Sequence, residues 1–140
     1  AVETELYGAH TQSLLMALHA DAPPERRLRD FLFRLMDSFE KHPAYFKILH
    51  RNLVDGRAAN QEFLKESLQS VFDELKFLLN QFSPGSGNGV VPVMIFSSIV
   101  GYETMRPAIE ALKGYRYSRV SREKERKVLT DTMMQMIASI

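Results

Sequence analysis

The sequence lacks cysteine altogether, which excludes disulfide bonds, thiol catalysis and zinc–thiolate sites. It also lacks an excess of either charge, because 18 Lys and Arg residues almost balance 17 Asp and Glu residues. No overall electrostatic field therefore favours binding to nucleic acid or to a membrane surface. With 45% hydrophobic and 25% charged residues, the chain has the composition of a globular protein, not of a disordered or fibrous one.

A long hydrophobic run is missing as well. The longest nearly apolar stretch spans residues 90–101, which is too short for the ~20 residues of a membrane span. The first residues, AVETE, are polar and acidic and do not resemble a secretory signal. The length of 140 residues is that of one domain with its own core. We therefore expect a single cytoplasmic domain over residues 1–140, without a membrane partner.

Apolar residues recur with a period near 3.6 along almost the whole chain, and no alternating run predicts a strand. This pattern predicts an all-α domain of six helices, at about residues 2–19, 28–41 with a start in DAPPE (21–25), 44–54, 60–82, 90–112 and 121–140. Pro43 suits the first position of the third helix, because its missing N–H would have no partner there. The fifth helix is apolar nearly all round, so we expect it to be covered on most sides. Pro107 should kink or interrupt that helix, and the segment SPGSGNG (83–89) has the composition of a flexible linker.

Groups that could converge for catalysis are scarce. The four histidines do not have the H-x-x-x-H or H-E-x-x-H spacing of zinc sites, and no serine lies in a G-x-S-x-G motif. His50, beside an aromatic stripe, is the best titratable candidate for a pocket wall, although a hydrogen-bonded boundary histidine is the commoner case. The sequence therefore predicts no enzyme, no cofactor and no metal site.

Two further segments superficially resemble binding motifs. GSGNG (85–89) follows a predicted helix instead of a strand and does not fit a phosphate-binding loop. YRYSRVSREKERK (115–127) holds six basic residues and two tyrosines, a combination that can contact nucleic acid. A solvated loop followed by the start of a helix is the more ordinary interpretation of this segment.

Two predicted helices carry more apolar surface than a subunit of this size easily hides. The helix at 90–112 has a line of small residues that would let another helix approach closely: Ser97, Gly101, Thr104 and Ala108. The last helix has an apolar stripe that continues to the end of the chain: Leu129, Met133, Met136, Ile137 and Ile140. Both faces fit a symmetric helical interface, and they fit a core within one subunit equally well.

The order of these features resembles the C-terminal ligand-binding and dimerisation domain of TetR family bacterial transcriptional regulators. The resemblance is carried by RLRDFLFRLMDSFEKHPAYFKILHRNLVDG (27–56), a helix, an HP break and a short helix. The long helix at 60–82 and VMIFSSIVGY (93–102), which is similar to the family's interface helix, support it. The resemblance implies a homodimer in which the last two long helices form a four-helix interface. The family's N-terminal helix-turn-helix domain is missing from the chain, so operator DNA would be a partner only through that domain.

The resemblance also implies a ligand pocket. In the family, the helices that correspond to 28–41, 44–54, 60–82 and 90–112 surround a pocket, and the short helix after the HP break forms part of its wall. A ligand that prefers one position of that helix would shift the population and alter DNA binding by the missing head. A wall of aromatic residues, methionines and few polar groups suits a mostly apolar small molecule. The predicted pocket residues are Phe33, Met36, Phe39, Phe46, Leu49, His50, Leu64, Ser67, Val71, Met94, Ser98, Tyr102 and Met105.

Two other classes of function stay open. A monomeric helical interaction module would use the same apolar faces for a different protein. A lipid or fatty-acyl carrier would need only an apolar cavity and would have no role on DNA. A helix-turn-helix in the parent gene would indicate the regulator, whereas a bound acyl chain without one would favour the carrier.

Overall fold

The computed structural model describes residues 2–56, 62–112 and 122–140, with all their side chains except those of residues 2–7, 63 and 64. These ranges contain six α-helices and no strand, which confirms the predicted all-α class. The helices are α1 (Val2–Leu18), α2 (Pro24–Lys41), α3 (Pro43–Val54), α4 (Glu62–Phe82), α5 (Val90–Glu110) and α6 (Arg122–Ala138). Within the described part of the chain, no helix is both long and apolar enough to cross a membrane.

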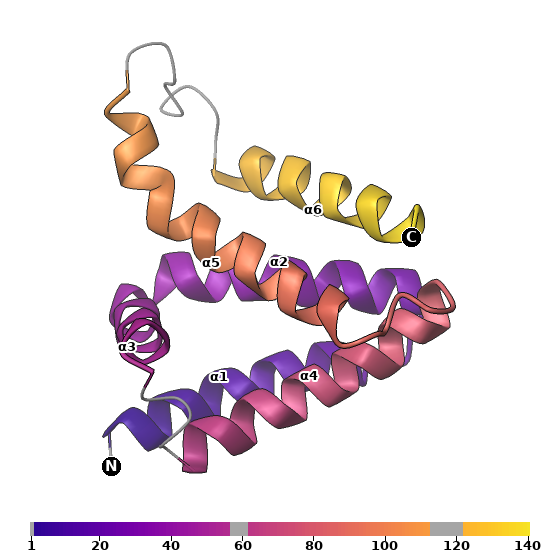
Figure 1. Cartoon of the computed structure of the whole chain (residues 1–140), viewed down its shortest axis with the longest axis horizontal. Coiled ribbons are helices and arrows are strands. Elements are labelled where there is room, and N and C mark those ends of the chain that lie inside the picture. The colour runs from indigo at the N-terminus through magenta and orange to yellow at the C-terminus, as the bar shows by residue number, and fades with distance from the viewer. Residues whose placement is uncertain (1, 57–61, 113–121) are drawn as a thin grey trace.

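The core lies among α1, α2 and α4, which pack against one another (Figure 1). Phe31, Leu32 and Leu35 of α2 and Leu78 and Leu79 of α4 are almost completely buried there. Complete burial of such a side chain contributes roughly 1.5–3 kcal/mol to folding. The helix α3 runs across one end of this bundle and is seen end-on in Figure 1. The helix α5 packs on α4 and α2. Of the described helices, α6 has an extensive contact with α2 alone.

The helix α2 is packed on two sides. Its predicted apolar stripe is buried at every position: Leu28, Phe31, Leu32, Leu35, Met36 and Phe39. Phe33 lies off this stripe, and the guanidinium of Arg126 from α6 covers its ring, with 5.1 Å between Cζ and the ring centroid. The helix α2 is therefore central to the fold, because it packs in the core on one side and holds α6 on the other.

The chain turns between α2 and α3 at His42. Pro43 begins α3, as predicted from its missing N–H. The N–H of His42 donates to the carbonyl oxygen of Ser38 at 3.0 Å, and its own carbonyl accepts from the N–H of Phe46 at 3.1 Å. At the other end of α3, Gly56 adopts a φ of 69°, a left-handed conformation that glycine enters without a steric penalty.

The segment 83–89 is packed against α4 and is not the free linker that its composition predicted. Ser86 is buried, and its Oγ donates to the carbonyl oxygen of Leu79 at 2.8 Å. The N–H of Gly87 donates to Oδ1 of Asn80 at 3.1 Å. A Cβ added at Gly87 would lie 2.3 Å from the carbonyl oxygen of Lys76, so only glycine fits this close approach. Composition could not predict these contacts, because they depend on where the preceding helix ends.

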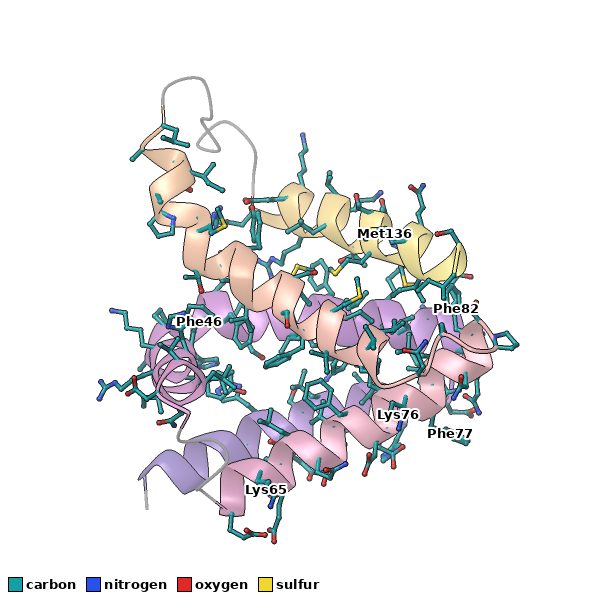
Figure 2. All side chains as sticks on the ribbon, viewed as in Figure 1. Phe46, Lys65, Lys76, Phe77, Phe82 and Met136 are labelled. Atoms are coloured by element: carbon teal, nitrogen blue, oxygen red, sulfur yellow. The ribbon has the colours of Figure 1, made fainter. Side chains whose placement is uncertain are left out.

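Pro107 was predicted to kink or to interrupt α5. The helix continues through Pro107 to Glu110 without interruption, and it changes direction toward its C-terminal end (Figure 1). Covering on most sides was also predicted, and within one chain this is wrong, because Val90, Met94 and Met105 are more than half exposed. Phe77, on the outer side of α4, is an exposed aromatic residue (Figure 2), whereas Val90, Met94 and Met105 are exposed apolar residues of one helix, α5.

Candidate functional site: two apolar grooves beside α5

An apolar groove of about 400 Å³ lies between α5 and α6, with Met36 of α2 also in its wall. The groove exists because α6 packs on α2 and has few close backbone contacts with α5. We call it the α5–α6 groove, and its lining residues are Met36, Val91, Met94, Ile95, Ser98, Ile99, Tyr102, Leu129, Thr132, Met133, Met136, Ile137, Ser139 and Ile140.

The few polar groups of the α5–α6 groove are mostly occupied by the chain itself. The hydroxyls of Ser98 and Thr132 donate to main-chain carbonyls one turn earlier in their own helices, at 2.7 and 2.8 Å. The hydroxyl of Ser139 makes a similar bond at 2.8 Å. Tyr102 differs, because its hydroxyl is buried and has no hydrogen-bond partner among the described residues. Among the described residues that line this groove, Tyr102 therefore carries the one buried hydroxyl without a hydrogen-bond partner.

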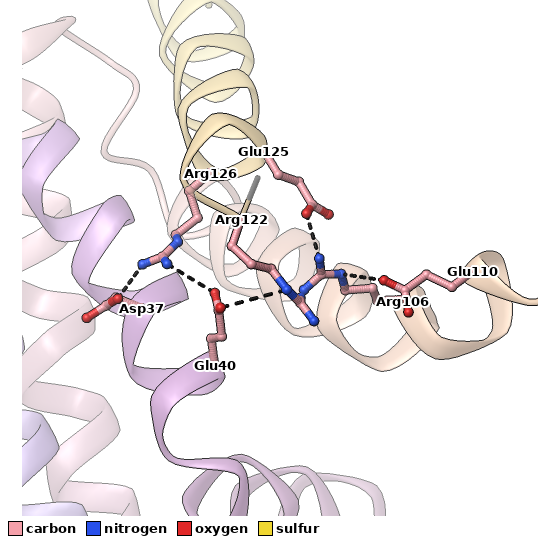
Figure 3. A network of polar contacts seen from close by, with 7 residues as sticks. All are labelled: Asp37, Glu40, Arg106, Glu110, Arg122, Glu125 and Arg126. Carbon is pink, nitrogen blue, oxygen red and sulfur yellow. Dashed lines mark hydrogen bonds and ion pairs between the residues drawn. The ribbon is translucent and has the colours of Figure 1, made fainter. Parts of the chain in front are cut away.

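A network of charged side chains lies beyond the Tyr102 end of this groove (Figure 3). Nη2 of Arg106 lies 2.6 Å from Oε2 of Glu125, so one turn of α5 separates this ion pair from Tyr102. Nε of Arg106 lies 3.4 Å from Oε1 of Glu110 on the same helix. Burial raises the pKa of Glu125, and the neighbouring carboxylate of Glu40 adds to this effect. The network thus joins the two helices where the groove ends.

The same network ties α6 to α2. Arg126 forms an ion pair with Asp37, and its Nη2 lies 3.2 Å from Oε2 of Glu40 (Figure 3). Nε of Arg122 lies 3.7 Å from Oε1 of Glu40. Burial disfavours the charged form of Asp37, but hydrogen bonds from Arg126 and Lys41 outweigh it and hold the pKa of this carboxyl below its ordinary value. The position of α6 over α2 is therefore set largely by polar contacts at this end.

A second groove, of about 520 Å³, lies on the other side of α5, where α3 and α4 approach it. We call it the α3–α5 groove, and it is lined by His50, Leu53, Leu68, Phe72, Val93, Phe96, Ser97, Val100, Gly101, Thr104 and Met105. The rings of Phe72 and Phe96 meet edge to face, with 5.5 Å between their centroids. A third hollow of about 20 Å³, walled by Leu49, Ser67 and Val71 among others, has room for about one water molecule.

The residues predicted for one ligand pocket are distributed over these hollows. Met36, Met94, Ser98 and Tyr102 line the α5–α6 groove, His50 and Met105 line the α3–α5 groove, and Leu49, Ser67 and Val71 surround the small hollow. Phe33 lies under Arg126, and the rings of Phe39 and Phe46 contact each other with centroids 5.0 Å apart. The side chain of Leu64 lies outside the described residues.

The residues predicted for a dimer interface divide in a similar way. The stripe of α6 (Leu129, Met133, Met136, Ile137 and Ile140) lines the α5–α6 groove, so part of it is covered by its own chain. Met136 and Ile140 of this stripe remain more than half exposed. Ser97, Gly101 and Thr104 line the α3–α5 groove, and Ala108 is exposed one turn further along α5. The sequence therefore indicated which faces are apolar. Which of these residues are buried and which are exposed depends on the packing of the helices.

Several residues of the α5–α6 groove were not predicted. Val91, Ile95 and Ile99 lie one turn apart on α5 and point to the groove, but periodicity cannot single them out on a helix that is apolar all round. The pairing of Arg106 with Glu125 was missed because the partners are 19 residues apart, beyond any intrahelical spacing rule.

The described residues contain no group of three or more His, Asp or Glu side chains that could hold a metal ion. No protein-family model, curated protein or solved structure significantly matches this chain. What the protein does is therefore inferred from its own helices, grooves and charges.

Proposed function

We propose that this chain is the effector-binding and dimerisation domain of a TetR-like bacterial transcriptional regulator. The order of six helices, the HP break between α2 and α3, and the long helices α4 and α5 support the proposal. In this proposal, the effector is a mostly apolar small molecule, the chain acts as a homodimer, and operator DNA is contacted through a separate N-terminal domain.

The observation that carries the proposal is the exposed apolar face of α5. Val90, Met94 and Met105 are each more than half exposed, and the small residues Ser97 and Gly101 lie between them along the helix. A Cβ added at Gly101 would have no atom within 4 Å, so nothing in the described chain requires glycine there. Glycine inside a helix costs roughly 0.5–1 kcal/mol relative to alanine. A helix of a second copy that packs closely against this face would explain why a glycine is found at position 101.

The two grooves beside α5 support the ligand-binding part of the proposal. Their volumes of about 400 and 520 Å³ fall within the range of small-molecule sites, which is roughly 300–1,000 Å³. Both are walled by apolar side chains, which favours an apolar effector over a phosphorylated or strongly ionic one. Because both share α5 as a wall, a ligand in either groove would act on the helix proposed to form the interface.

Light scattering at several concentrations tests the proposed dimer. The expected mass is twice the 16.1 kDa of one chain, and it should persist on dilution. Gly101→Leu should give a folded monomer, because an added Cβ meets no atom within 4 Å and leucine has a higher helix propensity than glycine. Ala9→Leu, which adds the same side chain at an exposed position of α1, is the matched control and should remain dimeric.

A wild-type protein that is monomeric at every concentration would contradict the proposal. So would a Gly101→Leu variant that stays dimeric, because the face of α5 would then not be the interface. A monomer that is purified with an acyl chain in a groove would instead indicate a lipid carrier, which the nearly continuous apolar wall of the α5–α6 groove also suits.

A further inference from the structure

We infer that the α5–α6 groove binds a single-chain aliphatic amphiphile, with an uncharged hydrogen-bonding head at Tyr102 and its tail directed toward Ile140. This inference rests on the proposed function and specifies the chemical class of the effector and its orientation in one of the two grooves.

The shape of the groove favours an extended chain. On α5 the lining residues run from Val91 to Tyr102, and on α6 they run from Leu129 to Ile140. At the rise of an α-helix, each of these walls is about 16 Å long. The helices run antiparallel, since Arg106 pairs with Glu125, so Tyr102 and Leu129 share one end and Val91 and Ile140 share the other. An elongated apolar slot of this kind is filled better by one alkyl chain than by a compact ring system.

The side chains along the slot suit an aliphatic tail. Met94, Met133 and Met136 contribute flexible thioethers, which adapt their shape to an apolar ligand. The serine and threonine hydroxyls of the wall donate to their own helices and do not compete for a ligand. Most of the slot therefore offers dispersion contacts and the exclusion of water, and no polar recognition.

Tyr102 provides the polar recognition at one end. Its hydroxyl is buried without a partner among the described residues, and such a group is costly to leave unsatisfied. A carbonyl, ester, amide or alcohol oxygen of a ligand would accept a hydrogen bond from this phenol. The free hydroxyl thus fixes which end of the slot receives the head.

The charges near Tyr102 select an uncharged head over an anionic one. The network holds four cations against five carboxylates: Lys41, Arg106, Arg122 and Arg126 against Asp37, Glu40, Glu103, Glu110 and Glu125. The guanidinium groups are already engaged with carboxylates (Figure 3). Burial raises the pKa of both Glu103 and Glu125, and it does so although Arg126 acts in the opposite direction on both and Arg106 does so on Glu103. A carboxylate or phosphate head would meet the same loss of hydration beside guanidinium groups that are already paired.

Isothermal titration calorimetry of the 140-residue chain at pH 7 tests the inference with three probes of equal tail length: decanol, decanoate and decyltrimethylammonium. Decanol should bind one molecule per chain and about tenfold or more tighter than decanoate, because of the carboxylate excess. Tyr102→Phe should weaken decanol binding about three- to tenfold, the effect of one lost neutral hydrogen bond, and should leave the cationic probe unchanged.

Two neighbouring serines provide a matched pair of variants for the location. Ser98 lines the α5–α6 groove and Ser97 lines the α3–α5 groove, and both are exposed on the same helix. Ser98→Phe should fill the slot and abolish decanol binding, whereas Ser97→Phe, on the face of α5 proposed for the dimer, should bind decanol whether the variant is a dimer or a monomer. Thermal melting of both variants verifies that they are folded.

Three results would overturn the inference without overturning the proposed function. Decanoate binding as tightly as decanol would refute the uncharged head, and tighter binding of the cation would mean that the carboxylates, and not Tyr102, select the head. Loss of decanol binding in Ser97→Phe but not in Ser98→Phe would place the ligand in the other groove. A dimer that binds none of the probes would refute the amphiphile and leave dimerisation standing. A monomeric wild-type chain that binds decanol as described would instead refute the proposed regulator and leave the groove assignment intact.

Discussion

Arg106 and Glu125 form a buried ion pair, 2.6 Å from Nη2 to Oε2, between two helices that otherwise have few close backbone contacts. Their side chains are only 7% and 9% exposed. The pair lies one turn beyond Tyr102, at the end of the α5–α6 groove. It therefore holds α5 and α6 together beside the gap that their apolar side chains leave. The separation of the two helices depends on this contact more than on backbone packing.

Removing one partner of this pair should destabilise the protein strongly. Arg106→Ala leaves Glu125 buried without its guanidinium, and breaking a buried ion pair in this way costs about 3 kcal/mol or more. The measurement is the free energy of unfolding in urea. Lys127→Ala removes an exposed pair with Asp131 (Nζ to Oδ2 3.0 Å), and this control should leave the free energy of unfolding almost unchanged.

Replacing both partners separates the cost of an unpaired charge from the worth of the contact. The double variant Arg106→Met with Glu125→Leu buries no unpaired charge, so it should lose less stability than Arg106→Ala alone. If the double variant is the less stable of the two, the pair contributes net attraction that apolar packing cannot replace.

The core of α2 should respond very differently from the surface of α4. Phe31 is 1% exposed, and Phe31→Ala should cost about 3–5 kcal/mol through lost burial and the cavity left behind. Phe77 is 62% exposed, and Phe77→Ala should change the free energy of unfolding by about 0.5 kcal/mol at most. Equal losses in the two variants would mean that the exposed face of α4 is covered in solution.

The sequence predicted the helices and the inner stripe of α2 because both follow from local periodicity. The stripe from Leu28 to Phe39 repeats every three or four residues, and a helix with one apolar face can bury only that face. The start of α3 at Pro43 was predictable for an equally local reason, the missing N–H. Asn60 and Ser121 are suitable N-cap residues for the predicted fourth and last helices, and both lie outside the described residues.

The two grooves were not predictable, because they depend on which helices fail to meet. Periodicity on α5 is weak because the helix is apolar nearly all round, so it could not distinguish the buried positions Ile95 and Ile99 from the exposed positions Met94 and Met105. The ion pairs that seat α6, such as Arg126 with Asp37, join residues 89 positions apart. Such pairings arise from the tertiary arrangement and have no local sequence pattern.

Protonation of Asp37 should make the protein less stable in acid. Its pKa is held below the ordinary value of 3.8, so the stabilisation is present above that value and is lost as the pH falls through the pKa of the folded state. Asp37→Asn should therefore lower stability at neutral pH and flatten the loss of stability between about pH 5 and pH 2. The measurement is the free energy of unfolding at several pH values. Asp30→Asn, at an exposed position of the same helix, is the control, and a flattened profile in this variant would refute the assignment.

Protonation of His10 should destabilise the contact between α1 and α3. Its ring stacks on Tyr45 with 3.9 Å between centroids and lies 4.7 Å from the ring of His42. Burial and the nearby His42 lower the pKa of His10 below its ordinary value of 6.5. The unfolded chain therefore takes up the proton first, so this contribution to stability is present above about pH 6.5 and is lost as the pH falls through the pKa of the folded state.

An NMR titration of the imidazole of His10 measures this effect directly, and its midpoint should lie below the ordinary value. His42→Gln should raise that midpoint, because it removes the neighbouring charge but leaves His10 stacked on Tyr45. His10→Phe keeps an aromatic ring against Tyr45 and cannot bind a proton, so its stability should vary less with pH between about pH 7 and pH 5 than that of the wild type. A His10 midpoint at or above the ordinary value would mean that water reaches the ring. The contact between α1 and α3 would then be more open in solution than the 8% exposure of His10 indicates.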